Sequence, residues 1–293
     1  MEVMKCDLHV HTIHSGMCTV PVAKNFCRES YNRPEAVYAK LKRLGMDLVT
    51  VTDHDCIDAC ESLRSHSDFF LSEEVTATLP SGTEAHIGVY DITDRDHIEI
   101  NRRRHDFESL AAYLREHQLL YGINHVFSGL TGRRSVSDYE LFETFVPCME
   151  IRNGAMLRRA NAYAAELASR SGKAITAGSD AHTMAGVGSA WTQVRGAKTK
   201  QEFLNGVRAG KGIARGVDGS FFKLMRDVVL IVLNMMKERP ITCALSPLVA
   251  GVPLVLLVNY WLEVAFAEKW FGRVTHRELL PLAAPSLAGE VQA

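Results

Sequence analysis

Histidine and acidic residues recur in this chain at the points where short apolar segments end. The first group is Asp7, His9 and His11, which alternate with Leu8 and Val10. Alternate residues of an extended strand lie on the same face, so the two imidazoles can converge on one metal ion.

The same kinds of residue follow the later apolar segments. The further candidate donors are Asp53, His54, Asp55, Glu73, Glu74, His86, Asn124, His125, Asp180 and His182. Imidazole and carboxylate donors without thiolates suit Zn, Mn or Fe in an open catalytic site better than a closed structural zinc site. More donors are present than one ion can use, so we expect two or three divalent ions. A dense hydrogen-bond network is the alternative way to satisfy such side chains, and metal is favoured over it.

Seven apolar segments must position these donors. The predicted strands span 4–10, 47–52, 69–77, 85–91, 119–124, 147–152 and 173–178. Helix-like segments separate them, with start signals at Pro34, at Ser137 with Glu140, and at Thr199 with Glu202. This alternation predicts an α/β fold with a mainly parallel sheet, closed at this length into a TIM-like barrel whose strand ends open on one face.

The character of the chain changes near residue 220. We expect a barrel over 1–219 and an apolar helical C-terminal extension over 220–293. Residues 221–236 are predicted to be helical, and 241–262 carry no charge, which meets the rule of about 20 apolar residues for a membrane-spanning helix. Proline, glycine and asparagine interrupt this run. Two interpretations stay open: a helical hairpin packed on the barrel or on a second subunit, and membrane attachment through 221–268.

Composition narrows the functional classes. The 293-residue chain is 47% hydrophobic and 23% charged, which is typical of a folded globular protein. Lys plus Arg (33) nearly balance Asp plus Glu (34), so there is no electrostatic reason to expect strong binding to nucleic acid. Seven scattered cysteines without a Cys-x-x-Cys pair, and an N-terminus without an apolar signal, predict a cytoplasmic protein that begins at Met1.

The order of these motifs resembles that of the PHP (polymerase and histidinol phosphatase) domains. The matching motifs are Asp7-Leu8-His9-Val10-His11, Thr52-Asp53-His54-Asp55, the Glu74 and His86 region, Asn124-His125 and Ser179-Asp180-Ala181-His182. The resemblance runs from Met4 to about Val217. It implies a distorted (β/α)7 barrel with a two- or three-metal site that hydrolyses phosphoesters, and it does not extend to the C-terminal segment.

By position, the resemblance implies eight metal ligands: His9, His11, His54, Glu74, His86, His125, Asp180 and His182. Glu74 is implied to bridge two ions, since the adjacent Glu73 points to the other side of an extended strand. The chain departs from the family at Gly16, where many members have an aspartate. An ion there is expected to be weakly held unless His14 compensates. The loop 17–33 is expected to lie over the strand ends and shape the pocket.

The expected chemistry is attack on phosphorus by a water that the ions activate. The candidate catalytic residues are His125, His182 and Asp53, with the two histidines as proton donors to the leaving oxygen. The substrate is expected to be a small phosphorylated molecule. The candidates for gripping its phosphate are Arg133, Arg134 and Arg152.

Two other interpretations of the donor pattern stay open. An amidohydrolase-like barrel uses similar ligands to cleave a C–N or C–O bond. A non-catalytic metal-stabilised module binds a ligand or a membrane partner without turnover. The motifs alone do not separate a monoester substrate from a diester.

Overall fold

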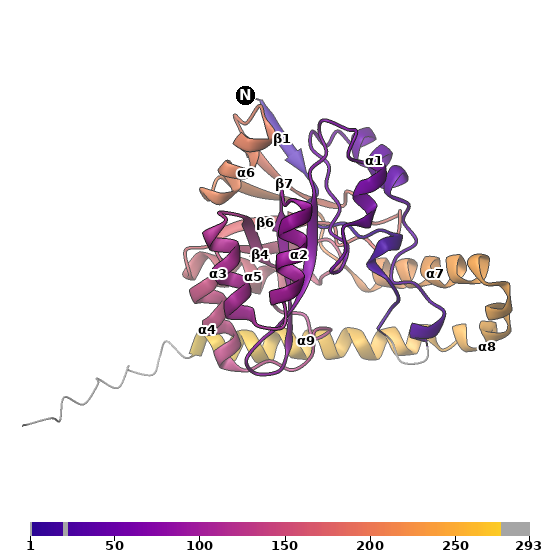
Figure 1. The fold of residues 1–293 in the computed structure, drawn as a ribbon. Helices are drawn as coiled ribbons and strands as arrows, with labels where there is room; N and C mark the ends of the chain where they lie inside the picture. Colours follow the sequence, from indigo (N-terminus) through magenta and orange to yellow (C-terminus); the bar gives the residue numbers. More distant parts are fainter. Residues whose placement is uncertain (1, 20–22, 277–293) are drawn as a thin grey trace, which may run out of the picture.

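The computed structural model describes residues 2–19 and 23–276 of the chain, in which strands and helices largely alternate (Figure 1). The strands are β1 (Val3–Cys6), β2 (Ser72–Thr78), β3 (Glu84–Tyr90), β4 (Leu120–Ile123), β5 (Cys148–Asn153), β6 (Ala174–Gly178), β7 (Ala190–Arg195) and β8 (Gly212–Gly216). The α-helices are α1 (Pro34–Arg43), α2 (Asp94–Arg103), α3 (Phe107–Glu116), α4 (Val136–Phe145), α5 (Arg158–Arg170), α6 (Lys200–Arg208), α7 (Phe221–Glu238), α8 (Ser246–Val249) and α9 (Val252–His276). The α/β class predicted from the sequence is confirmed.

The described strands form two sheets. One has the order β2-β3-β4-β5-β6, and the other has the order β1-β7-β8. In the larger sheet β2, β3 and β4 pair antiparallel, whereas β4, β5 and β6 pair parallel. The sheet is therefore mixed, and the expectation of a mainly parallel sheet was wrong for β3. Only residues 79–83 separate β2 from β3, which is too short for the crossover that a parallel pair requires.

The predicted strand at 47–52 is an extended segment without a regular ladder. Isolated parallel bridges join Val49 to Phe69 and His54 to Glu74. On its other side, Thr52 N donates to the carbonyl of Val10 at 2.8 Å. Residues 7–11 in turn run beside the end of β6, where a parallel bridge joins Val10 to Ala181. Two irregular segments thus lie between the ends of the larger sheet, although the described strands do not themselves form a closed barrel.

The helix start signals have mixed outcomes. Helix α1 begins at Pro34, and the Thr199 side chain caps α6 by accepting from the Glu202 N–H, as predicted. The predicted cap at Ser137 is wrong by two residues, since Ser135 and Asp138 form the reciprocal capping box of α4.

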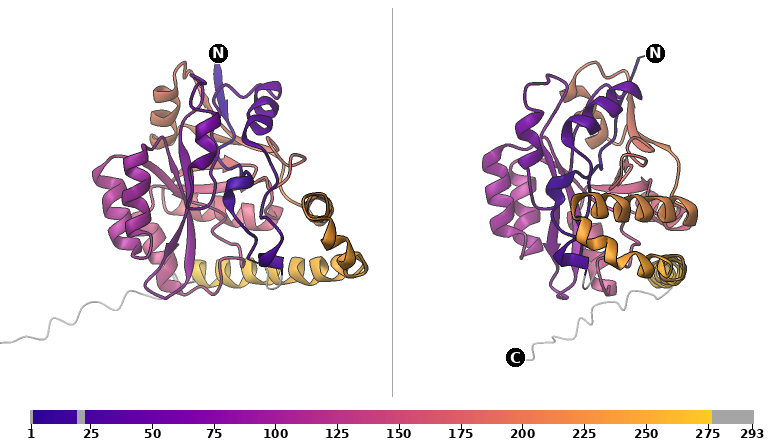
Figure 2. Two further views of the ribbon diagram at one scale, coloured as in Figure 1. Left: turned by 45° about the vertical axis from the view of Figure 1, so that its right-hand side comes forward. Right: turned by 90° about the vertical axis from the view of Figure 1, so that its right-hand side faces the viewer.

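The C-terminal segment folds as a helical hairpin. Helices α7 and α9 run along one side of the body and are joined at their far end through a 3-10 turn at Pro240–Leu245 and α8 (Figures 1 and 2). The uncharged run 241–262 is thereby divided among three elements. No helix within 2–19 and 23–276 has both the length and the apolar character to cross a bilayer. Residues 277–293 lie outside the described part of the extension.

Helix α9 packs on the body as well as on α7. Its buried residues Ala267 and Trp270 belong to the same apolar cluster as Tyr139 of α4 and Leu167 of α5. The Trp270 ring stacks on Tyr139 with centroids 5.9 Å apart. The C-terminal half of α9 is therefore part of the main core.

We expect the substitution Trp270→Ala to lower the free energy of unfolding by about 3–5 kcal/mol, because it leaves a cavity in that core. Trp261, on the same helix, is 68% exposed whereas Trp270 is 5% exposed. Trp261→Ala is the matched control and should change stability by less than about 0.5 kcal/mol. Urea denaturation followed by circular dichroism measures both. Equal, small losses in the two variants would contradict the packing of α9 on the body.

Candidate metal centre

Glu74 is a fully buried carboxylate in β2 that faces a cluster of imidazoles. Its two oxygens lie 3.2–3.5 Å from ring nitrogens of five histidines: His9, His11, His54, His86 and His125. These histidines come from segment 7–11, the end of segment 47–54, β3 and the turn after β4. Glu73, its neighbour, points the other way and accepts from His97 Nδ1 of α2 at 2.7 Å, as strand alternation predicts.

A second carboxylate, Asp180, completes the other end of the cluster. Its Oδ1 lies 3.3 Å from His11 Nε2 and 3.5 Å from both His9 Nε2 and His182 Nδ1. The structure thus brings together all eight side chains that the sequence proposes as ligands. Donor atoms within 4.8 Å of one another form four groups: His11, His54 and His182; His9, His125 and Asp180; His9, His11 and Glu74; and His54, Glu74 and His86.

Metal ions would satisfy the donor atoms better than hydrogen bonds among these atoms do. The buried atoms His54 Nδ1, His86 Nδ1 and Glu74 Oε2 have no hydrogen-bond partner in the described part of the chain. His9 Nε2 and His11 Nε2 face each other at 3.0 Å. Polar atoms left without partners in a protein interior are costly, and a divalent cation placed among them would satisfy nitrogen and oxygen lone pairs together.

Further buried side chains hold the ring orientations. Glu150 Oε1 lies 2.9 Å from His9 Nδ1, and Glu150 Oε2 accepts from the backbone N–H of His125 at 3.0 Å. His11 Nδ1 lies 3.0 Å from Ser15 Oγ. Hydrogen bonds of this kind fix a ligating imidazole so that its other nitrogen points at the ion. The sequence analysis missed Glu150, although a carboxylate inside the apolar segment 147–152 was the available signal.

Asp53, a candidate catalytic residue, is absent from the four donor groups. Its carboxylate instead accepts from Thr12 N, Thr12 Oγ1 and Ser15 Oγ, each at 2.6 Å. These bonds hold the turn that follows His11. The contacts of Asp53 are those of a positioning residue.

Glu29 is a cluster residue that the sequence analysis did not name. Its Oε1 lies 3.5 Å from His54 Nε2 and 3.6 Å from His182 Nε2. The backbone brings it there, because Met17 and Arg28 form an antiparallel bridge and Glu29 N donates to the carbonyl of Gly16 at 3.1 Å. Loop 17–33 therefore returns a carboxylate to the side of Gly16, the position at which the sequence lacks an expected aspartate.

Comparison with known protein families gives a match over part of this chain. Residues 158–211 match the family model of a PHP-associated region. The donor cluster carries the motifs through which the sequence resembles the PHP domains. The matched region, residues 158–211, is similar to PHP-associated sequences. A sequence comparison with characterised proteins gave no match.

Solved structures share the fold of this chain. A Bacteroides vulgatus two-domain protein with a predicted PHP-like metal-dependent phosphoesterase aligns with TM-score 0.54 and 15% identity, over 73% of this chain and 65% of that one. PsfC from Pseudomonas syringae aligns with TM-score 0.54 and 17% identity, over 81% and 99%. The lesion-specific endonuclease PfuEndoQ from Pyrococcus furiosus aligns with TM-score 0.51 and 18% identity, over 74% and 60%. At these identities the likeness concerns the fold.

The electrostatics of the donor cluster keep Glu74 and Asp180 ionised. Burial opposes charge on Glu74, but the surrounding imidazoles, His9 first, hold the pKa of Glu74 well below its usual range. Asp180 likewise has a pKa far below its usual value because His9 and His11 outweigh its burial. Burial also opposes charge on His11, yet Asp180 and Glu74 raise its pKa to about 10. A cation that enters the cluster therefore meets ionised oxygens and displaces protons from imidazole.

The three candidate phosphate-binding arginines have other surroundings. Arg134 is buried and donates to the carbonyl of Glu84 and to Thr131 Oγ1. Arg152 donates to the carbonyl of Gly216 at 2.7 Å. A register shift in β5 between Glu150 and Arg152 breaks the alternation that would give them the same face. Arg133 is exposed. The contacts described for Arg134 and Arg152 do not include the metal cluster.

We expect Glu74→Gln to reduce the metal content of the purified protein by at least one ion per chain, because the neutral amide removes the negative charge that five imidazoles share. Glu73→Gln is the matched control, since Glu73 is equally buried but faces His97. Plasma mass spectrometry gives the number of ions, and circular dichroism shows that both variants are folded. Equal metal content in the two variants would exclude Glu74 as a ligand.

Proposed function

We propose that this chain is a PHP-type, metal-dependent hydrolase that cleaves a phosphoester bond of a small molecule. The observation that carries the proposal is the convergence of five imidazoles on the buried Glu74 carboxylate. Two of their buried nitrogens, His54 Nδ1 and His86 Nδ1, have no hydrogen-bond partner in the described structure. Divalent ions bound there would lower the pKa of a bound water and polarise the phosphoryl oxygens. The PHP-like phosphoesterase fold of a neighbour supports this reaction class.

In this proposal the residues of the chain bind, orient and protonate. Glu150, Ser15 and Asp53 hold the first motif in place, and Glu74 with Asp180 supplies the negative charge. Either His125 or His182 could protonate the leaving oxygen. The His182 side chain is 23% exposed and the His125 side chain is 9% exposed, so His182 is the better placed to reach a substrate.

The seven-stranded barrel expected from the sequence is part of the proposal. Segments 7–11 and 47–54 lie between β6 and β2. A bridge joins segment 7–11 to the residues after β6, bridges join segment 47–54 to β2 and the residues before it, and a backbone hydrogen bond joins the two segments to each other. These contacts support an irregular ring of seven segments, two of which lack regular ladders. Such a ring accounts for the convergence of donors from β2, β3 and the two irregular segments at one end.

The four donor groups support two or three ions, and we propose that Glu29 belongs to the group of His11, His54 and His182. Its carboxylate lies against two of these imidazoles, and burial of Glu29 is outweighed by them, so the pKa of Glu29 is lowered. The donor set, with nitrogen and oxygen atoms and without thiolate, suits Zn, Mn or Fe.

We expect Glu29→Ala to weaken binding of the most loosely held ion by at least tenfold, or to remove it, while the remaining ions stay bound. His14→Ala is the control, because His14 is the alternative substitute for the missing aspartate. Competition with a coloured chelator gives the affinities, and plasma mass spectrometry gives the number of ions. If His14→Ala loses the ion and Glu29→Ala keeps it, the assignment to Glu29 is wrong.

Hydrolysis of aryl phosphate monoesters and diesters by metal-loaded protein tests the function directly. We expect turnover that a chelator abolishes and that the double variant His9→Ala/His11→Ala reduces by at least a hundredfold, since it removes two ligands of the Glu74 group. An aryl amide and a lactone, assayed in parallel, test the amidohydrolase alternative.

The outcomes separate the three interpretations. Turnover of the phosphate esters alone supports the proposal, and turnover of the amide or lactone alone would replace it. Bound metal without turnover on the whole panel would favour a metal-stabilised binding module.

A further inference from the structure

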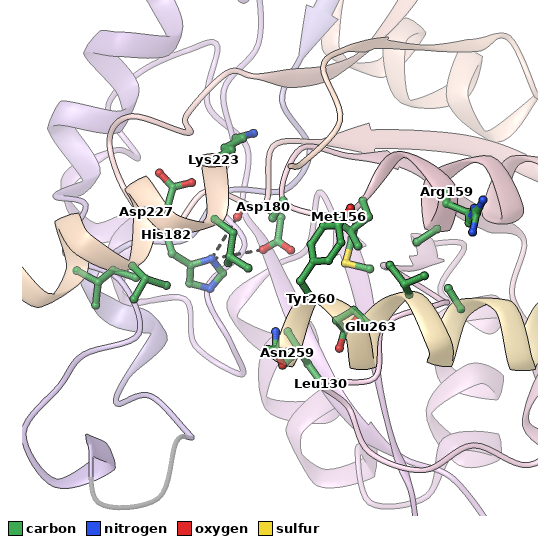
Figure 3. Close-up of a pocket in the computed structure, with 18 residues that line it drawn as sticks. Leu130, Met156, Arg159, Asp180, His182, Lys223, Asp227, Asn259, Tyr260 and Glu263 are labelled. Atoms are coloured by element: carbon green, nitrogen blue, oxygen red, sulfur yellow. Dashed lines mark hydrogen bonds and ion pairs between the residues drawn. The ribbon is translucent and has the colours of Figure 1, made fainter. Parts of the chain in front are cut away.

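A cavity of about 230 Å³ lies between the metal cluster and the C-terminal hairpin (Figure 3). Asp180 and His182 form part of its wall, so it opens directly onto two of the proposed ligands. The rest of the wall comes from α7, α9, residues 155–160 and Leu130. The cavity therefore joins the part of the chain that carries the PHP motifs to the part that lies beyond them.

The helices present apolar side chains to this cavity. Helix α7 contributes Leu224, Val228 and Ile231, and α9 contributes Tyr260 and Val264. Met156 lines the side that faces the body. Binding of an apolar group against such a wall is favourable, because it removes apolar surface of both the group and the wall from water.

The charged side chains of the wall do not provide a second anion site. Lys223 donates to Ser189 Oγ at 2.8 Å and to the carbonyl of Gly154, and burial lowers its pKa. Arg159 pairs with Glu268. Apart from the proposed ligands Asp180 and His182, the remaining charged residues of the wall are the acids Asp227 and Glu263.

Both acids already accept hydrogen bonds from the protein. Asp227 accepts from Thr183 Oγ1 at 2.8 Å, and Glu263 accepts from the N–H of Gly129 at 3.1 Å. The neutral polar groups of the wall are the Asn259 amide and the Tyr260 hydroxyl. A nucleotide, a sugar phosphate or a nucleic-acid strand carries more polar and anionic groups than these two can satisfy, and would place the rest against apolar and acidic side chains.

We propose that the hairpin cavity binds the apolar alcohol part of a monoester substrate, an alkyl chain of roughly eight carbons or an aryl group of similar size, with its phosphate at Asp180 and His182. The chain length follows from the cavity volume. About 230 Å³ holds roughly eight groups the size of a water molecule, each of which occupies about 30 Å³. The proposal rests on the proposed phosphoesterase function. Hydrolysis would break the P–O bond, add water and give the apolar alcohol and inorganic phosphate, so the alcohol product occupies the same cavity.

Two series of ligands test the cavity and the reaction separately. Binding of n-alkanols from butanol to decanol, measured by calorimetry, needs no metal. Hydrolysis of the corresponding n-alkyl phosphates by metal-loaded protein needs both sites. In each series the dissociation constant or KM is expected to fall by up to about fourfold per methylene, which corresponds to about 0.8 kcal/mol, and to level off near eight carbons.

Adjacent residues of α7 provide a matched pair of variants. Val228 lines the cavity, whereas Val229 is 37% exposed on the same helix and is not part of its wall. Val228→Asp is expected to weaken octanol binding and to raise the KM for octyl phosphate by at least thirtyfold, with ethyl phosphate changed less than twofold. Val229→Asp should leave all of these within twofold. Ile231→Ala, which removes three carbons without adding charge, should weaken octanol binding about tenfold and serves if Val228→Asp does not fold.

The two proposals fail in different ways. Hydrolysis that is independent of chain length, or a preference for a nucleoside monophosphate over octyl phosphate, would overturn the cavity assignment and leave the phosphoesterase function intact. Binding of alkanols that rises with chain length, without hydrolysis of any ester, would support the cavity and count against the phosphoesterase function. Equal effects of Val228→Asp and Val229→Asp on octanol binding would also overturn the assignment.

Discussion

The burial of Glu74 is the constraint on which the rest of the site depends. A carboxylate removed from water is costly unless positive or polar groups surround it, and here nitrogens of five imidazoles lie within 3.5 Å of its oxygens. Those imidazoles come from segments that are far apart in the sequence. The fold must therefore bring four separate chain segments to one point, and the interior hydrogen bonds of Glu150 and Asp53 keep them there.

The backbone is irregular at two residues of the cluster. His125 and Asp180 adopt positive φ angles of 28° and 49°, a region that residues other than glycine seldom occupy. Each is held by a bond to a buried neighbour: His125 N donates to Glu150, and Asp180 N donates to the carbonyl of His9 at 2.7 Å. Strained residues of this kind concentrate at functional sites.

Residue spacing predicted the donor cluster well because ligand type and strand alternation are local properties. That His9 and His11 share one face, and that only one of Glu73 and Glu74 can face the cluster, follow from side-chain alternation. The choice of Glu74 came from the resemblance to the PHP motifs. The short connection 79–83 was a local signal for the antiparallel β2-β3 hairpin that the predicted alternation overlooked. The sequence could not predict the β7-β8 pairing or the shift in β5 that gives Arg152 different contacts, since these depend on contacts between distant segments. Glu29 was missed because no periodicity links a loop residue to the histidines that it contacts.

Glu29 reaches the cluster from a loop, whereas Glu74 reaches it from the middle of a strand. Under the proposed assignment, an ion held by Glu29 is stabilised by its ligands but must also offset the entropy of closing that loop, a cost that an ion beside Glu74 does not carry. The occupancy of the ion site beside Glu29 would then depend more strongly on the concentration of free metal than the occupancy of the neighbouring ion sites. Under that assignment, a loop carboxylate in place of a turn residue would give one centre both tightly held and readily exchanged metal ions.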